Sequence, residues 1–384
     1  MLGLFSAFEW ALLGPVLIGC IYSLLCLGAV FWYLRRAVHP PATGAWPPVT
    51  ILKPIHGLEK NLEENLRSAC ELDYPTYQVV LAVQRLEDPA LPLLRELERE
   101  YGSARISVVA VENQPVVNGK VQNLIHALAA ARHDIVVISD SDIGLRPDYL
   151  RQIVAPLADP EVGCVCTLYR AVDSDVWHEK LEHLSYNSEF IVNVIFAEVF
   201  SAYPFCPGCS VAIRRKALDE IGGFEPLLDF LVEDFELGRR INERGYRTEL
   251  IPYFVDTTVD IERADDWWSH QVYWDQNTRA VAPVGFFFTV LIQPLPFALI
   301  FALTRGFDPW GLGVLAGTLA VRWFTRAAIF WRIGDRAGLR LLHWLPVRDL
   351  AGFGSWFVAL FKRTFEWRHF HFELTRDGRI LPRR

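Results

Sequence analysis

The sequence predicts an α/β protein in which a domain built on a mainly parallel sheet is flanked by transmembrane helices. Three observations lead to this fold class. The chain has 384 residues, 52% of them hydrophobic, and a mean hydropathy of +0.19, which is apolar for a purely soluble protein. Long uncharged runs stand near its beginning and beyond residue 283. Between them, short apolar runs alternate with helix-like segments, which is typical of β-α units.

The first uncharged run covers residues 11–34 and ends at Arg35 and Arg36. About 20 apolar residues cross a bilayer core, so this run is long enough to span one. A signal peptide is the alternative, but it would have a shorter apolar run and a small-residue cleavage site. We therefore expect an N-terminal transmembrane anchor over residues 1–36, with the two arginines on the cytoplasmic side.

Two further apolar runs follow the central block. Residues 284–303 and residues 309–331 are each long enough to cross a bilayer. Only a short turn separates them, which predicts a transmembrane hairpin over residues 283–332. Two crossings return the chain to the cytoplasmic side, so the protein is expected to be a multi-pass membrane protein.

The last apolar run, residues 344–361, contains Arg348 and Asp349 and is only marginally long enough to span. We interpret it as an interfacial or re-entrant helix, with a fourth span as the alternative. Residues 333–384 are thus expected to hold this helix and a cytoplasmic tail.

The central block is expected to be a cytoplasmic domain over residues 49–282, entered through a Pro-rich linker at residues 37–48. Its first part alternates strands and helices. The strands are expected at residues 49–53, 77–83, 105–111 and 134–139, and the helices at residues 58–70, 89–101, 119–131 and 147–157. In such sheets ligands bind beyond the carboxyl ends of the strands.

Acidic residues stand at that edge of the predicted sheet. Asp88 follows the second strand, and Asp140 and Asp142 follow the fourth strand in an Asp-Ser-Asp sequence. Carboxylate oxygens suit Mg²⁺ or Mn²⁺, which would neutralise charge on a departing nucleotide diphosphate. Two structural alternatives stay open, since Asp-x-Asp is common in turns and Asp88 before Pro89 is a normal helix start.

Two further charged positions have a functional and a structural interpretation. Lys120 precedes the Asp140 strand and could contact a phosphate as a point charge, or lie in an exposed first helical turn. Glu233 and Asp234 open a later helix. A carboxylate there could act as a general base toward an acceptor hydroxyl, or merely interact with the helix dipole.

Residues 267–281 are rich in Trp and Tyr just before the second apolar run. An aromatic belt at a membrane interface explains part of this composition. His270 and Arg279 could still face phosphate groups, although an isolated histidine is more often packed or exposed than catalytic.

Flanking membrane segments suggest that one reactant is a lipid.

Charge and cysteine content argue against a nucleic-acid-binding protein and against a disulfide-rich scaffold. The formal net charge is -7 and no long Lys/Arg run appears, which argues against nucleic-acid binding. The seven cysteines are scattered, which argues against a disulfide scaffold. A four-thiolate zinc site remains an alternative to small buried thiols, and the spacing favours the thiols; the four residues are Cys164, Cys166, Cys206 and Cys209.

Seven motifs, in order over residues 49–280, resemble those of the ceramide glucosyltransferases. These are membrane-bound, inverting, family-2-like glycosyltransferases with a GT-A fold, and the related hopanoid glycosyltransferases share much of the pattern. The motifs are Leu52-Lys53-Pro54-Ile55-His56-Gly57, Glu71-Leu72-Asp73-Tyr74-Pro75, Val83-Gln84 to Asp88-Pro89-Ala90, Lys120-Val121-Gln122-Asn123-Leu124, Asp140-Ser141-Asp142, Gly208-Cys209-Ser210 and Glu233-Asp234-Phe235.

This resemblance implies a role for each acidic motif. Asp88 would contact the nucleotide, and Asp140 with Asp142 would hold the metal and the diphosphate. Lys53 and Lys120 would line the donor pocket. The implied reaction moves a hexose from a UDP-sugar, with UDP-glucose the leading donor, to a lipid hydroxyl, with ceramide the leading acceptor.

The resemblance also implies that Asp234 is the base that deprotonates the acceptor hydroxyl. The family's Gln/Arg-x-x-Arg-Trp motif aligns with the segment from His270 to Trp274. Trp274 matches this motif, but Tyr273 stands where the family has arginine, and Arg279 is a candidate substitute. This departure leaves the identities of the donor and the acceptor open.

Several alternatives remain at this point. A hopanoid or another lipid could be the acceptor, with UDP-N-acetylglucosamine as a donor. A processive polysaccharide synthase is disfavoured by the small number of spans and the altered motif. In a different class, the chain could be a non-catalytic membrane module that binds nucleotide or lipid. The retained acidic positions argue against that class.

Overall fold

The computed structural model describes residues 6–38, 46–112, 118–201, 206–367, 370–375 and 378–382. Most of the expected linker, residues 39–45, lies outside them. The chain forms two compact units, each assembled from several segments. The first comprises Met1–Arg35, Ser174–Ser201 and Ile261–Glu373, and the second comprises Arg36–Asp173, Ala202–Asp260 and Leu374–Arg384. Both units therefore take residues from the domain expected at 49–282.

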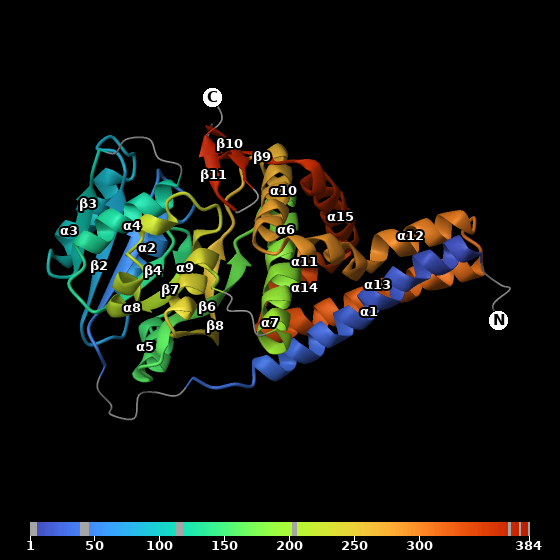
Figure 1. The fold of residues 1–384 in the computed structure, drawn as a ribbon, viewed down its shortest axis with the longest axis horizontal. Helices are drawn as coiled ribbons and strands as arrows, with labels where there is room; N and C mark the ends of the chain where they lie inside the picture. Colours follow the sequence, from blue (N-terminus) through green and yellow to red (C-terminus); the bar gives the residue numbers. More distant parts are fainter. Residues whose placement is uncertain are drawn as a thin grey trace. The chain divides into compact units, whose positions relative to one another are not determined.

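The second unit contains a sheet of eight strands (Figure 1). They are β1 (Val49–Pro54), β2 (Tyr77–Val83), β3 (Ile106–Ala110), β4 (Ile135–Ser139), β5 (Ile143–Gly144), β6 (Val162–Val172), β7 (Ser210–Arg214) and β8 (Arg247–Thr258). Their order across the sheet is β3-β2-β1-β4-β7-β6-β8-β5. The four expected strands are confirmed as β1 to β4.

The first half of the sheet is parallel and the second half is mixed. β1 pairs in parallel with β2 and β4, and β2 pairs in parallel with β3. Every residue of β1, β2 and β4 is buried, which explains why these strands read as continuous apolar runs. β7 lies antiparallel between β4 and β6, so the sheet is parallel mainly on the side that the sequence predicts.

Short helices join the strands of the second unit. They are α2 (Leu62–Cys70), α3 (Leu91–Tyr101), α4 (Gly119–Ala129), α5 (Tyr149–Val154), η1 (Ala155–Ala158), α8 (Arg215–Glu220), η3 (Glu225–Leu227) and α9 (Glu233–Glu243), and a short strand, β11 (Ile380–Pro382), lies near the C-terminus. The helix expected from Pro89 begins instead at Leu91. The Asp88 carboxylate accepts a hydrogen bond from the Ala90 N–H at 2.9 Å, which forms a turn before the helix begins.

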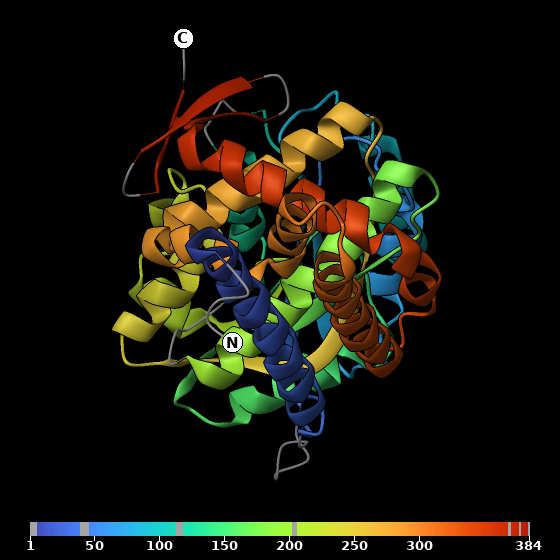
Figure 2. The same cartoon turned by 90° about the vertical axis from the view of Figure 1, so that its right-hand side faces the viewer.

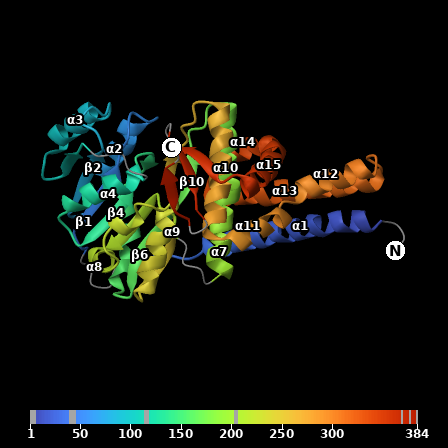
Figure 3. The same cartoon turned by 45° about the horizontal axis from the view of Figure 1, so that its top comes forward.

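The first unit contains three apolar helices that run side by side: α1 (Ala7–Tyr33), α12 (Pro294–Thr304) and α13 (Pro309–Ile333) (Figure 3). α1 and α13 are each long and apolar enough to cross a membrane. The run expected as a single span at 284–303 is a bent pair instead, with α11 (Pro283–Phe288) and η4 (Thr289–Ile292) at 47° to α12. Pro294 begins the second limb, and a proline cannot continue the hydrogen-bond ladder of the preceding helix.

The other elements of this unit are α6 (Trp177–Leu184), η2 (Ser185–Phe190), α7 (Ile191–Phe200), α10 (Ala264–Val281), α14 (Arg336–Leu341), η5 (Leu342–Trp344), α15 (Leu345–Phe361), β9 (Thr364–Trp367) and β10 (Phe370–Leu374). α6, η2 and α7 follow one another in one long rod (Figure 1). α10, α11 and α15 share a small core that contains Val272, Phe286, Trp356 and Ala359, and α10 and α15 lie side by side in Figure 2.

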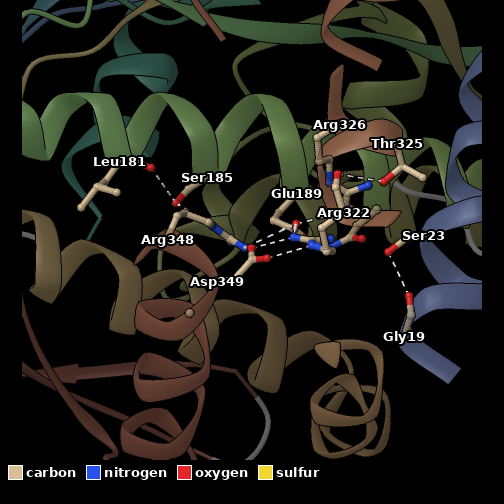
Figure 4. Close-up of polar contacts among 12 residues, drawn as sticks. Gly19, Ser23, Leu181, Ser185, Glu189, Arg322, Thr325, Arg326, Arg348 and Asp349 are labelled. Carbon is tan, nitrogen blue, oxygen red and sulfur yellow. Dashed lines mark hydrogen bonds and ion pairs between the residues drawn. The ribbon is translucent and has the colours of Figure 1, made fainter. Parts of the chain in front are cut away.

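A cluster of charged side chains lies largely buried inside the first unit (Figure 4). Glu189 of the η2 turn accepts hydrogen bonds from Arg322 at 2.6 Å and from Arg326 at 3.0 Å. Asp349 of α15 binds Arg322 through both oxygens, at 2.6 and 2.8 Å, and Arg348 lies 3.4 Å from Glu189. We call these five residues the arginine cluster. Such buried charges are stable only when they are paired, so the cluster ties α13 to α15 and η2.

Replacing Glu189 by Gln should destabilise the first unit. Within the described residues, Glu189 is the only carboxylate bonded to Arg326, so the change leaves a buried cation without its partner. Removing one partner of a buried pair costs about 3–5 kcal/mol. The measurement is thermal unfolding of the purified protein in detergent. Asp265→Asn, at the exposed pair with Arg263, is the matched control in the same unit and should change the midpoint far less. Equal midpoints for the two variants would contradict this account.

Candidate active site

The turn between β4 and β5 holds Asp140 and Asp142 at the carboxyl end of β4. The Asp140 N–H donates to the carbonyl of Cys209 at 3.0 Å, which fixes the turn against the segment leading into β7. On β8, the Thr257 hydroxyl donates to the Asp142 carboxylate at 2.7 Å. Both carboxylates therefore lie at the expected edge of the sheet, in a turn that hydrogen bonds fix to neighbouring segments.

The two carboxylates suit a divalent cation. Burial and the neighbouring charge of Asp140 raise the pKa of Asp142 to about 6, so the two acids repel one another. Oδ1 of Asp140 is buried and accepts no well-formed hydrogen bond from the described part of the chain, although the Lys120 nitrogen lies 2.9 Å away. Mg²⁺ or Mn²⁺ bound by these oxygens would relieve the repulsion.

Lys120 lies at the centre of the acidic residues. The Asn118 side chain accepts from the Val121 N–H at 3.1 Å and caps α4, which places Lys120 in the first turn. Its ammonium group lies 2.9 Å from Asp140 and 3.3 Å from Glu233, and it donates to the Gly208 carbonyl at 3.3 Å. Burial lowers the pKa of Lys120, but these acids outweigh it and hold the pKa well above its ordinary value.

Asp234 stands in the first turn of α9 and is held by backbone donors. The N–H groups of Gly208 and Phe235 each donate to its carboxylate at 2.7 Å. A Cβ atom at Gly208 would lie 2.4 Å from the Asp234 Cβ, so only glycine allows this approach. Burial and the charge of Glu233 raise the pKa of Asp234 to about 7.

A small hollow adjoins this carboxylate. Asp234, Glu233 and Lys120 supply its polar lining, and the rest is mostly apolar. The apolar side chains include Val121, Leu124, Ile138, Val211, Phe224, Leu227 and Leu237. The structure therefore brings Lys120, Asp140 and Asp234 into one group, with the base candidate beside an apolar wall.

Asp88 lies at the ends of the neighbouring strands β1 and β2. In addition to the hydrogen bond from the Ala90 N–H, the two carboxylate oxygens of Asp88 accept the Gly57 N–H at 3.1 and 3.2 Å. The Nδ1 atom of His56 lies 3.7 Å from the same carboxylate. The structural interpretation is thus partly correct, because Asp88 binds backbone before α3. Its assignment to the nucleotide stays a prediction.

Two side chains contact the turn that holds Asp140. Lys53 belongs to β1, and Glu59 lies in the segment that follows β1. Lys53 is fully buried, and its ammonium group donates to the Asp140 carbonyl at 2.8 Å and the Ile143 carbonyl at 3.3 Å. Direct contact of Lys53 with a donor stays a prediction. Glu59, which our sequence interpretation missed, accepts from the Ser141 hydroxyl at 2.5 Å. Its only signal was an acidic residue shortly after a strand end.

The remaining site candidates lie on α10, in the first unit. The Trp274 indole donates to His270 Nε2 at 2.9 Å, so this nitrogen is unprotonated and Nδ1 carries the ring proton toward Glu182, 2.8 Å away. Arg279 donates to the carbonyls of Leu360 at 3.1 Å and Lys362 at 2.7 Å, at the end of α15. These contacts give Arg279 a structural role, and its proposed role at the phosphates stays untested.

Comparison with known proteins adds relatives over most of the chain. Ceramide glucosyltransferase 1 of Caenorhabditis elegans is 25% identical over 389 residues, which covers 94% of this chain and 80% of that protein. Ceramide glucosyltransferase 3 of the same organism is 23% identical and covers 97% and 82%. An N-acetylglucosaminyltransferase of Mesorhizobium japonicum is 26% identical over 280 residues and covers 67% and 64%.

A solved structure confirms the fold class. A mannosyltransferase from Pyrobaculum calidifontis, in complex with GDP-Man and Mn²⁺, superimposes with a TM-score of 0.53 and 21% identity, covering 90% of this chain and 98% of that one. At this identity the likeness concerns the fold alone, and it agrees with the predicted GT-A class. The sequence pattern of glycosyl transferase family 21 matches residues 12–380, nearly the whole chain. The protein therefore belongs to glycosyl transferase family 21.

Proposed function

We propose that this glycosyltransferase moves a hexose from a UDP-sugar to the hydroxyl group of a lipid, with inversion at the anomeric carbon. UDP-glucose and ceramide are the leading substrates. The observation that carries the proposal is the Asp234 carboxylate, which is held by two backbone N–H groups beside an apolar wall. Membership of family 21 and the two ceramide glucosyltransferase relatives support the choice of a lipid acceptor.

Asp234 is the proposed general base. Its pKa of about 7 makes it basic enough to accept a proton from a hydroxyl group while still largely ionised at slightly alkaline pH. The acceptor oxygen would bond to the anomeric carbon as the bond from that carbon to the diphosphate oxygen breaks. The hydroxyl proton passes to Asp234, and the bonding electron pair leaves with the diphosphate.

Asp140 and Asp142 are the proposed ligands of Mg²⁺ or Mn²⁺. A bound divalent ion would neutralise charge on the leaving diphosphate. Lys120 holds the Asp140 carboxylate in place and adds a positive charge on the same side of the site. Asp88 is proposed to contact the nucleotide, from the neighbouring strand ends. The apolar helices α1 and α13 and the bent pair before α13 are proposed to anchor the chain in the membrane, with the catalytic domain facing the cytoplasm.

A second candidate is transfer to a hopanoid or another lipid, with UDP-N-acetylglucosamine as donor. Two observations favour this second reaction as an alternative. Tyr273 replaces the arginine of the family motif, and a relative in Mesorhizobium japonicum is named an N-acetylglucosaminyltransferase.

Release of UDP by the purified protein in detergent tests both candidates. UDP-glucose, UDP-galactose and UDP-N-acetylglucosamine are each offered with ceramide, diacylglycerol or a hopanoid, in the presence of Mn²⁺ or Mg²⁺. We expect release that requires one lipid and that falls about 10²–10⁴-fold in Asp234→Asn, while UDP binding is retained. Glu243→Gln, at the far end of α9, is the matched control. Unchanged transfer in Asp234→Asn would remove it as the base.

Asp140→Asn should weaken donor binding that depends on metal. The amide is a poorer ligand for a hard cation than the carboxylate, and the change also removes the charge partner of Lys120. Calorimetric titration with UDP, with and without Mn²⁺, measures the effect. Wild-type affinity in the variant, with wild-type dependence on Mn²⁺, would exclude Asp140 as a metal ligand.

The pH profile of kcat/KM should rise through about pH 7 and level off above it, because Asp234 must be ionised to accept a proton. Glu59 needs a control of its own, since burial and the charges of the Asp-Ser-Asp turn raise its pKa to about 7 as well. The rise should persist in Glu59→Gln. A flat profile in the wild type, or a rise that disappears in Glu59→Gln, would contradict the role of Asp234.

A further inference from the structure

Three cysteine side chains converge in the interior of the second unit. Cys164 and Cys166 are two residues apart on β6, and Cys206 lies four residues before β7. Their sulfur atoms are 3.9 Å apart for Cys164 and Cys166, 3.9 Å for Cys164 and Cys206, and 3.2 Å for Cys166 and Cys206. All three thiols are buried, with at most 2% of each residue exposed.

This spacing matches the ligand sphere of a small thiophilic ion. Two sulfurs bound to one zinc ion at about 2.3 Å stand about 3.8–4.0 Å apart for tetrahedral or trigonal angles. Two of the three pairs are already at that spacing, at 3.9 Å. The third pair, at 3.2 Å, would have to open by about 0.6 Å on binding.

Backbone pairing and close packing hold the three thiols in place. Cys164 and Cys166 belong to a strand that is paired on both sides, antiparallel with β7 and parallel with β8. Cys206 packs so closely on α9 that a Cβ atom at Gly238 would lie 2.8 Å from the Cys206 Cβ. Two of the three ligands therefore stand on a paired strand, where ligands hold their geometry better than on a loop.

We propose that Cys164, Cys166 and Cys206 form a binding site for a thiophilic d¹⁰ cation, Zn²⁺ or Cu⁺. Thiolate sulfur selects these ions over hard cations such as Mg²⁺. Among the described residues no histidine, carboxylate or fourth thiol joins the group, so the protein supplies three ligands. The thiols lose their protons on binding, and Zn²⁺ leaves one net negative charge where Cu⁺ leaves two.

Such an ion would also fix the proposed catalytic base, a consequence that rests on the proposed function. Cys206 stands two residues before Gly208, whose N–H donates to Asp234 at 2.7 Å. Coordination of Cys206 would hold this short segment to β6. The thiolate site would thus have a structural role. It would bind a different class of ion from the proposed Mg²⁺ or Mn²⁺ site at Asp140.

Elemental analysis of the full-length protein, purified in detergent without chelator, tests the site. We expect about one zinc or copper ion per chain, and loss to background in Cys164→Ser, Cys166→Ser and Cys206→Ser. Cys209→Ser is the matched control, because it alters a thiol of the same segment that lies outside the group; it should keep the metal. Equal metal content in wild type and Cys164→Ser, or a wild-type mass that shows a disulfide, would overturn the proposal.

Titration of chelator-treated wild type with Co²⁺ gives a second readout that needs no variant. Binding by three thiolates should produce intense sulfur-to-metal charge-transfer absorption, and Zn²⁺ should abolish it. Absence of that absorption in folded protein would overturn the site. Neither measurement depends on sugar transfer, so a metal-loaded but inactive protein would retain this site while removing the proposed function.

Discussion

The contact between Lys120 and the acidic residues is the constraint on which the site depends. A single ammonium group reaches Asp140, Glu233 and the Gly208 carbonyl, which come from the turn after β4, from α9 and from the segment before β7. Without that charge, buried carboxylates would repel one another and would have to take up protons or move apart. The cap by Asn118 matters for the same reason, because it fixes where α4 begins and therefore where the ammonium group lies.

The same neighbourhood places two aspartates, Asp140 and Asp234, in different surroundings. Asp140 forms an ion pair with Lys120, which holds the carboxylate in place at the proposed cation site. Asp234 instead lies in a buried setting beside the negative charge of Glu233, and together they raise its pKa to about 7. Different environments for chemically identical groups would let one site hold both the proposed metal ligand and the proposed base. Gly208 makes this possible, since any larger residue would push Asp234 away from its backbone donor.

The sequence predicts the parts of the fold that local patterns encode. Continuous apolar runs locate β1 to β4, and the strand ends then place Asp88 and Asp140 on the ligand edge. Pairing between distant segments has no such signal, so the antiparallel β7 and the long parallel pair of β6 and β8 were not anticipated. For the same reason Glu59 was missed, because its contact with Ser141 joins residues that are far apart in the chain. The bend at Pro294 was readable in principle, since proline interrupts a helix.

Charged residues lower the hydropathy of α13 and of residues 344–361, and so make both weaker candidates for membrane spans. In the structure these charged residues form ion pairs within the first unit. Arg322 and Arg326 lie in the second half of α13, and Arg348 and Asp349 make residues 344–361 a poor span by themselves. In the structure, Asp349 binds Arg322 with both oxygens, and Glu189 reaches Arg322 and Arg326. Each charge that counts against an independent apolar helix is therefore matched by a partner on another element. Because an unpaired ion is costly in a low-dielectric setting, this matching specifies which helices must pack together.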